Sequence, residues 1–243
     1  MGVVEEIAHK VLFPVAILGQ DVSITTLVLL MWLAVFLVFF FFFIASRRVD
    51  LLPSGMQIFA EYLISLIDEY VFVNIEVDRR IWLSFLVALF SFILVSNLLG
   101  LVPGFTSPSS DINFTATLAV IVFIIVQAVG IRKKGLIKYL SSLVPADVPL
   151  PIKFMLFPIE LIGQVARPFS LAVRLFANLF AGHMVLLSVI GLILVFRNHA
   201  ITPFPLIGAV LISAFEMFVA FIQAFIFTFL TSLYIGEALG SEH

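Results

Sequence analysis

Long apolar segments separated by short polar ones make up most of the chain. Residues 22–46 contain no charged residue. As a helix, this 25-residue run would be about 37 Å long, enough to cross a hydrocarbon core of about 30 Å. Similar apolar runs cover residues 81–99 and 113–131, with a segment rich in Gly, Pro and Ser between them. The pattern therefore predicts three transmembrane helices.

Residues 52–72 follow a different pattern. Apolar positions such as Phe59 and Leu63 recur at helical spacing, and polar positions such as Glu61 and Asp68 lie between them. This alternation predicts an amphipathic helix that lies at the membrane interface.

The last hundred residues contain two apolar segments that are too long to stand upright in a membrane. Residues 154–196 and 204–238 would form helices of about 65 Å and 52 Å, and their few Gly and Pro residues are scattered singly. We therefore expect a hairpin of two long, strongly tilted membrane helices. The fold class expected is an all-α polytopic membrane protein. Its single membrane domain, 1–243, would comprise a first transmembrane helix (22–46), the interfacial helix (52–72), a transmembrane hairpin (81–131) and the long tilted hairpin (154–238).

Composition supports a membrane protein and excludes several other classes. The chain is 63% hydrophobic and 12% charged, which is far from the balance of a soluble domain. It has no cysteine for disulfides or thiol chemistry, and no metalloprotease, phosphate-loop or Ser/His/Asp motif. Basic residues interleaved with aromatic ones are absent, which argues against nucleic-acid binding. We expect no cofactor, no metal and no enzymatic activity of the chain by itself.

The basic residues predict the orientation. Lys and Arg flank the amphipathic segment and follow the third span, whereas residues 100–112 contain none. By the positive-inside rule, 132–138 would face the cytoplasm or the mitochondrial matrix. The N-terminus would then lie on the outer side and the C-terminus on the inner side.

Polar residues inside the two long segments, above all the ionisable ones, are the candidate functional groups, because charges within a membrane are costly and rare. They form one stripe on each predicted helix, at intervals of seven residues or multiples of seven. The first stripe is Glu160, Arg167 and Arg174, and the second is Glu216, Gln223 and Glu237. Two facing polar stripes predict a polar path.

Each of these residues also has a simpler interpretation. Glu160 and Arg167 could form an ordinary ion pair near the inner surface, and Glu237 could be a solvated residue at a helix end. Ser170, Asn178 and Gln223 could be interhelical hydrogen-bonding residues. His183 lies on the opposite face of an ideal helix from Arg174 and need not share its path. The simple interpretation is weakest for Arg174, because no acidic residue lies three or four positions away.

Two stretches carry a specific resemblance to a known family. "RPFSLAVRLFANLFAGH" and the later "FEMFVAFIQAFIFTFLTSLYI" resemble subunit a of the F-type ATP synthase, the stator subunit that passes ions to the rotating c-ring. The resemblance implies protons as the transported ion, and the c-ring, peripheral-stalk b-type subunits and the lipid bilayer as partners. It also implies a bacterial plasma membrane or a mitochondrial inner membrane as the location.

The resemblance further implies roles for individual residues. Arg174 matches the essential arginine that faces the carboxylate of each passing c subunit. Gln223 matches the glutamine opposite it, and Asn178 and Ser170 match polar neighbours.

Other residues match the proton path of the family. His183 and Glu216 match a pair that takes up protons from the outer side, with the acid and the histidine exchanged relative to bacterial relatives, so their order in the path stays open. Glu160 matches an acidic position on the inner side. Asp111 and Asn113, at the outer mouth of the third span, are further candidates.

Three functions remain to be separated: an ion channel of a rotary motor, a secondary transporter and a passive assembly anchor. A transporter is typically built from paired repeats and broken helices, which are not evident in the sequence. An anchor would not need two polar stripes.

Overall fold

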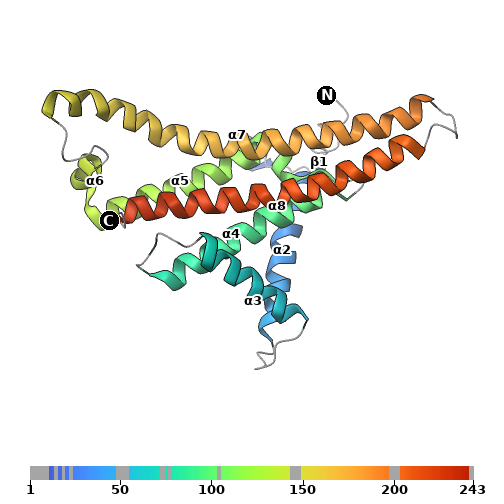
Figure 1. Ribbon diagram of the computed structural model, residues 1–243, viewed down its shortest axis with the longest axis horizontal. Helices are drawn as coiled ribbons and strands as arrows, with labels where there is room; N and C mark the ends of the chain where they lie inside the picture. The colour runs from blue at the N-terminus through green and yellow to red at the C-terminus, as the bar shows by residue number, and fades with distance from the viewer. Residues whose placement is uncertain are drawn as a thin grey trace.

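The protein is a bundle of helices preceded by short strands (Figure 1), as seen in a computed structural model. The residues that the structure describes are 11–13, 16–17, 20–21, 24–47, 55–71, 75, 78–102, 105–142, 149–196 and 203–240. The helices are α2 (Thr26–Ser46), α3 (Met56–Leu66), a π-helical turn η1 (Ile67–Val71), α4 (Arg79–Leu99), a 3-10 turn η2 (Pro108–Ser110), α5 (Ile112–Lys134), α6 (Leu136–Ser142), α7 (Leu150–Phe196) and α8 (Pro203–Leu239).

The prediction of an all-α polytopic membrane protein is confirmed. Within the described residues, five helices are long and apolar enough to cross a membrane: α2, α4, α5, α7 and α8. α7 and α8 contain 47 and 37 residues, so they are about 70 Å and 55 Å long. Both exceed a hydrocarbon core of about 30 Å, as the apolar runs predicted.

The start of the first span was predicted wrongly. α2 begins at Thr26 rather than at residue 22, because Ile24–Thr25 forms a short strand, β4, that pairs antiparallel with β1 (Val11–Phe13). β-Branched residues favour strands when a partner is available. A second pair of short strands, β2 (Ala16–Ile17) and β3 (Gln20–Asp21), lies between them in the chain.

The described part of the interfacial segment is helical from Met56 to Val71. α3 covers Met56–Leu66 and continues into the π-helical turn, while the first residues of the predicted range 52–72, and its last, lie outside the described residues. Ile58, Phe59 and Tyr62 are exposed on one side of α3, and Ala60 and Leu63 are buried on the other. The exposed apolar side suits contact with lipid.

The helices lie with their ends at two opposite poles of the molecule. α7 and α8 run side by side along its longest dimension, α5 lies next to both, and α2 crosses them at a steep angle (Figure 1). One pole holds the end of α5, α6, the start of α7 and the end of α8; we call it the basic end, after Arg132, Lys133 and Lys138. In the opposite direction along the hairpin, η2 and the end of α4 lie beside the middle of α7 and α8, and the end of α7 and the start of α8 extend beyond them (Figure 1); we call this side of the molecule the η2 end.

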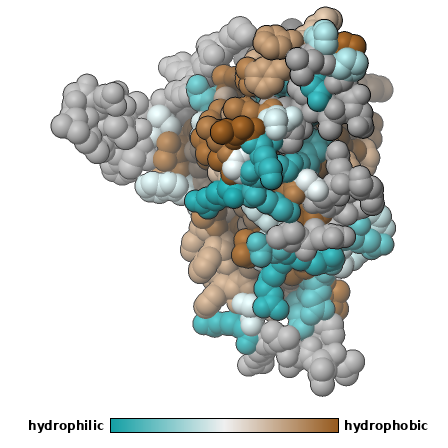
Figure 2. All heavy atoms as spheres, turned by 90° about the vertical axis from the view of Figure 1, so that its left-hand side faces the viewer, coloured by the Kyte–Doolittle hydropathy of each residue, from teal (hydrophilic) through white to brown (hydrophobic). Residues whose placement is uncertain are grey.

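Hydrophilic side chains gather across the basic end, with apolar ones beside them (Figure 2). Arg132, Lys133 and Lys138 are exposed there, and so are the apolar residues Ile137 and Phe154. Exposed charges next to exposed apolar side chains are typical of a membrane interface.

The core lies where α4, α5, α7 and α8 meet. Its side chains are mainly Leu, Ile, Val, Phe and Ala, and they fill the space on the buried faces of these four helices. The central members are Leu86, Phe90, Ile93, Val122, Leu171, Leu175, Ala224, Phe227 and Ile235. This core fixes α7 and α8 relative to one another, and so it positions the polar residues described below.

The segment between α5 and α7 contains a helix that was not predicted. Gly135, at a φ of 77°, ends α5, and α6 then folds back so that the Tyr139 ring packs against Gly130. Pro151 lies in the first turn of α7, where a proline sacrifices no hydrogen bond.

We expect Gly130→Ala to detach α6. A Cβ at Gly130 would lie 2.3 Å from Cε2 of the Tyr139 ring, so the ring must move away, at a cost of about 1–3 kcal/mol. Trypsin should then cut after the exposed Lys138 faster in the variant than in the parent. Gly163→Ala is the control, because a Cβ there meets no atom within 4 Å. Equal cleavage rates in all three proteins would contradict a docking role for Gly130.

Candidate functional site

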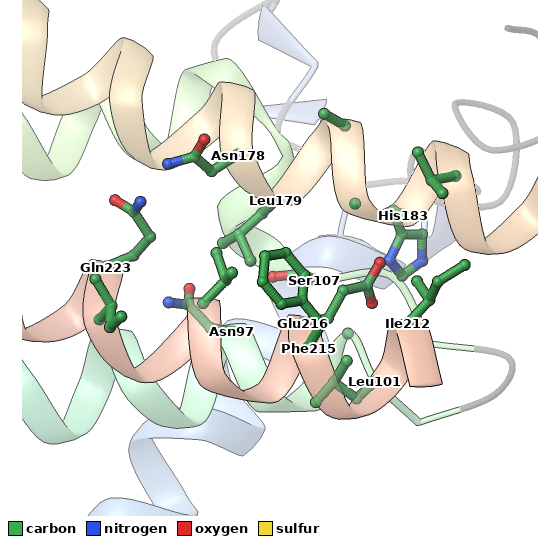
Figure 3. Close-up of a pocket in the computed structure, with 16 residues that line it drawn as sticks. Asn97, Leu101, Ser107, Asn178, Leu179, His183, Ile212, Phe215, Glu216 and Gln223 are labelled. Atoms are coloured by element: carbon green, nitrogen blue, oxygen red, sulfur yellow. The ribbon is translucent and has the colours of Figure 1, made fainter. Parts of the chain in front are cut away.

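A cavity of about 450 Å³ lies between α7 and α8, toward the η2 end. Four of the polar residues predicted from the sequence line it: Asn178 and His183 from α7, and Glu216 and Gln223 from α8. Asn178 and Gln223 extend toward one another across the gap between the two helices (Figure 3). Polar residues of the two helices therefore share this cavity, although the members of the first stripe, Glu160, Arg167 and Arg174, do not line it.

Glu216 is the buried acid of this cavity. Its side chain points toward His183 (Figure 3), only 8% of the residue is exposed, and Oε1 has no hydrogen-bond partner among the described residues. The carboxylate fits there because Gly182 has no side chain: a Cβ at Gly182 would lie 2.8 Å from Oε1. A buried carboxyl oxygen without a partner beside a cavity is a group that can exchange protons with water in that cavity.

His183 lines the cavity, whereas Arg174, on the opposite face of an ideal helix, is exposed and does not line it. His183 therefore does not share the position of Arg174, as the separation of nine residues allowed. It lies instead in the same cavity as Asn178.

Two further polar residues of the cavity were not singled out from the sequence. Asn97 of α4 donates a hydrogen bond from Nδ2 to the carbonyl oxygen of Ala220 at 3.1 Å, while its Oδ1 has no partner among the described residues. Ser107, just before η2, donates from Oγ to the carbonyl oxygen of Ser96 at 3.0 Å. The sequence signal for Asn97 was a lone amide inside the apolar run 81–99, but only the packing of α4 against α8 places it at the cavity.

Arg174 lies on α7 just before the cavity residues and differs from the other arginine of its stripe. Its side chain is exposed, and it forms no ion pair with any residue in the described parts of the chain. Ser170, one turn earlier, is also exposed. Neither residue lines the cavity, so both face the surface of the isolated chain.

A second polar cluster lies toward the basic end. Arg167 forms an ion pair with Glu237 of α8, a looser one with Glu160 at 3.6 Å, and places its guanidinium 5.1 Å from the centre of the Tyr234 ring. The interpretation of Glu237 as a solvated helix end was wrong, because the hairpin brings it back against α7. The predicted pairing of Glu160 with Arg167 is present.

Amides extend this cluster across α5 to α6. Gln127 donates from Nε2 to Oε1 of Gln164 at 3.0 Å, and Gln127 also hydrogen-bonds Tyr139. Burial raises the pKa of the Tyr139 phenol, so it stays neutral in this contact. Polar side chains of α5, α6, α7 and α8 thus meet between Arg174 and the basic end.

Asp111 and Asn113 are not among the residues that line the cavity. Oδ1 of Asp111 accepts a hydrogen bond from the backbone N–H of Asn113 at 2.6 Å, which caps the start of α5. Their role in a proton path stays a prediction.

These features define a polytopic α-helical membrane protein with ionisable residues within its long C-terminal hairpin. Comparison with known proteins agrees: a family model for the ATP synthase A chain matches residues 28–236. A protein of Chloroherpeton thalassium named ATP synthase subunit a is 39% identical over 92% of this chain and 69% of its own length. Proteins of the same name from Rubrobacter xylanophilus and Rhodospirillum rubrum are each 36% identical, over 98% and 97% of this chain and 97% of their own lengths. The chain belongs to the ATP synthase A chain family.

Proposed function

We propose that the chain is the stator subunit of an F-type ATP synthase that carries protons to and from the c-ring through two offset half-channels. The observation that carries this proposal is the position of Arg174, an exposed cation without an ion-pair partner in the described parts of the chain, which lies between two polar regions along α7. One region is the cavity, on the η2 side, and the other is the cluster around Arg167, on the basic side. The c-ring and the peripheral-stalk b-type subunits are the expected partners.

The cavity is suited to the outer half-channel. Its volume of about 450 Å³ has room for several water molecules, and Glu216 and His183 can take up and release protons. Protons would pass from this water to the carboxylate of a c subunit near Asn178 and Gln223. Protons would move from the outer side to the c subunit whichever of Glu216 and His183 takes them up first.

Arg174 would then act on the carboxylate that arrives next. A fixed cation lowers the pKa of a nearby carboxylate, so the proton leaves toward the inner side and the ionised form passes the arginine. Guanidinium stays charged at any working pH, which prevents a direct proton short circuit between the two half-channels. Glu160, on the basic side of Arg174, would receive or relay the released proton.

The membrane potential supplies the driving force in this proposal. Moving one charge across the membrane is worth about 2.3 kcal/mol per 100 mV, so several protons per turn could support ATP synthesis. The orientation follows from charge: the basic end would face the cytoplasm or the matrix, and the η2 end the outer side.

Single-cysteine labelling tests the outer half-channel, because the chain has no native cysteine. Val219 lines the cavity, whereas its neighbour Phe218 is exposed on the apolar surface of α8. In the assembled enzyme we expect a membrane-impermeant thiol reagent to modify a cysteine at position 219 from the outer side, and to leave one at 218 unmodified.

A cysteine at position 138 calibrates the sidedness of this experiment. Lys138 is exposed at the basic end, so the reagent should reach it only from the inner side. Labelling of position 138 only from the outer side would reverse the orientation. An unreactive position 219, with 138 reacting as expected, would argue against a water-filled path through the cavity.

A further inference from the structure

Arg167 and Arg174 lie on nearly the same face of α7. Seven residues separate them, which in a helix means a rise of about 10 Å and a rotation of about 20°. If both guanidinium groups were free, a carboxylate moving past this face would meet two cations in succession. Arg174 alone can attract the passing carboxylate only if the charge of Arg167 is already neutralised by an ion pair.

Two side chains of α8 contact the guanidinium of Arg167. Glu237 pairs with Nη1, and the ring of Tyr234, one turn earlier on α8, lies beside the guanidinium. Glu160 contacts Nη2 at a longer distance, 3.6 Å, and belongs to α7 itself. Of these contacts, those with Glu237 and Tyr234 hold the guanidinium toward α8, whereas Glu160 lies on the same helix as Arg167.

We propose that Glu237 is a positioning residue, which holds the Arg167 guanidinium against α8, so that of these two arginines only Arg174 lacks an ion-pair partner among the described residues. This inference rests on the proposed function, because it concerns the same passing carboxylate. Loss of Glu237 would free Arg167 to swing toward the exposed face and attract the carboxylate there. Glu160 could not prevent this, because a partner on the same helix does not fix Arg167 toward α8.

The test is a set of three variants of the assembled enzyme: Glu237→Gln, Arg167→Gln and the two combined. Proton pumping driven by ATP in inverted membrane vesicles is measured and normalised to the amount of assembled enzyme. For Glu237→Gln we expect pumping to fall about fivefold, because a cation is left without its closest partner. The double variant should recover to within about twofold of the parent, because the competing cation is gone.

This recovery separates positioning from simple helix attachment. If the pair served only to fasten α8 to α7, each single variant and the double variant would be impaired to a similar extent. Glu237→Asp, which keeps the charge, should retain most of the activity, and Glu61→Gln on α3 controls for loss of a carboxylate far from this cluster. A double variant no better than Glu237→Gln would overturn the inference, as would normal pumping by Glu237→Gln.

Arg174→Ala, assayed in the same vesicles, keeps the two proposals distinguishable. Normal pumping by Arg174→Ala would refute the proposed function itself. An inactive Arg174→Ala together with an unrescued double variant would refute only the role of Glu237.

Discussion

Replacing Arg174 with alanine is expected to abolish both ATP-driven proton pumping and proton-driven ATP synthesis, while the complex still assembles. The side chain is exposed and has no ion-pair partner in the described residues, so its removal costs the isolated chain little packing. Its proposed partner, a carboxylate of the ring, would lose the fixed cation that lowers its pKa. We expect a loss of more than about 100-fold, as is common when a preorganised charge is deleted. A passive proton leak through the variant would agree with this role.

Two substitutions sharpen this prediction. Arg174→Lys should restore little activity, because a hydrated ammonium that can lose its proton when buried does not replace a planar, permanently charged guanidinium. Arg47→Ala serves as the matched control: Arg47 is exposed at the end of α2, where it lies 4.8 Å from the centre of the Phe43 ring, and we expect normal activity. Fully coupled ATP synthesis by an assembled Arg174→Ala complex would contradict the proposed function.

The second large effect is expected for Glu216→Gln. The substitution keeps the size of the side chain, so α8 should pack as before, but an amide cannot take up and release a proton. Because Glu216 is the buried acid of the cavity and its Oε1 has no hydrogen-bond partner among the residues that the structure describes, we expect proton flux to fall by about tenfold or more with normal assembly. Flux is measured as passive proton conduction and as ATP-driven pumping in membrane vesicles. Unchanged flux with an unchanged pH dependence would assign Glu216 to packing.

Gly182 provides an independent check on the position of this carboxylate. Gly182→Ala removes no titratable group. It puts a Cβ 2.8 Å from Oε1 of Glu216, so the carboxylate must move. A reduced flux in this variant would show that the position of Glu216 matters as well as its acidity. Gly191→Ala on the same helix is the control, because a Cβ there meets no atom within 4 Å.

Much of the fold could be predicted because membrane spans depend on local hydrophobicity. The spans α2, α4 and α5 and the excess length of α7 and α8 all follow from the lengths of apolar runs. The errors lie where partners far along the chain decide the structure. Ile24–Thr25 became a strand because it pairs with Val11–Phe13, and α6 formed a helix that docks on Gly130.

The candidate site divides in the same way. The sequence alone determined which residues are exceptional, because a charge such as Arg174 or Glu216 inside a long apolar run is costly wherever the run folds. It also determined that Glu160, Arg167 and Arg174 share one stripe of their helix, since helical periodicity is local. The stripe could not reveal which of these charges are neutralised, because ion pairs depend on distances between helices.

Only the tertiary structure decided those partners. The return of α8 along α7 pairs Glu237 with Arg167 and leaves Arg174 without an ion-pair partner among the described residues, although both arginines belong to one stripe of α7. The packing of α4 and η2 against the hairpin brings Asn97 and Ser107 to the cavity of Glu216. The physical reason is that helix formation and membrane insertion depend on neighbours within a few turns, whereas a cavity or an ion pair depends on side chains that folding brings together from distant parts of the chain.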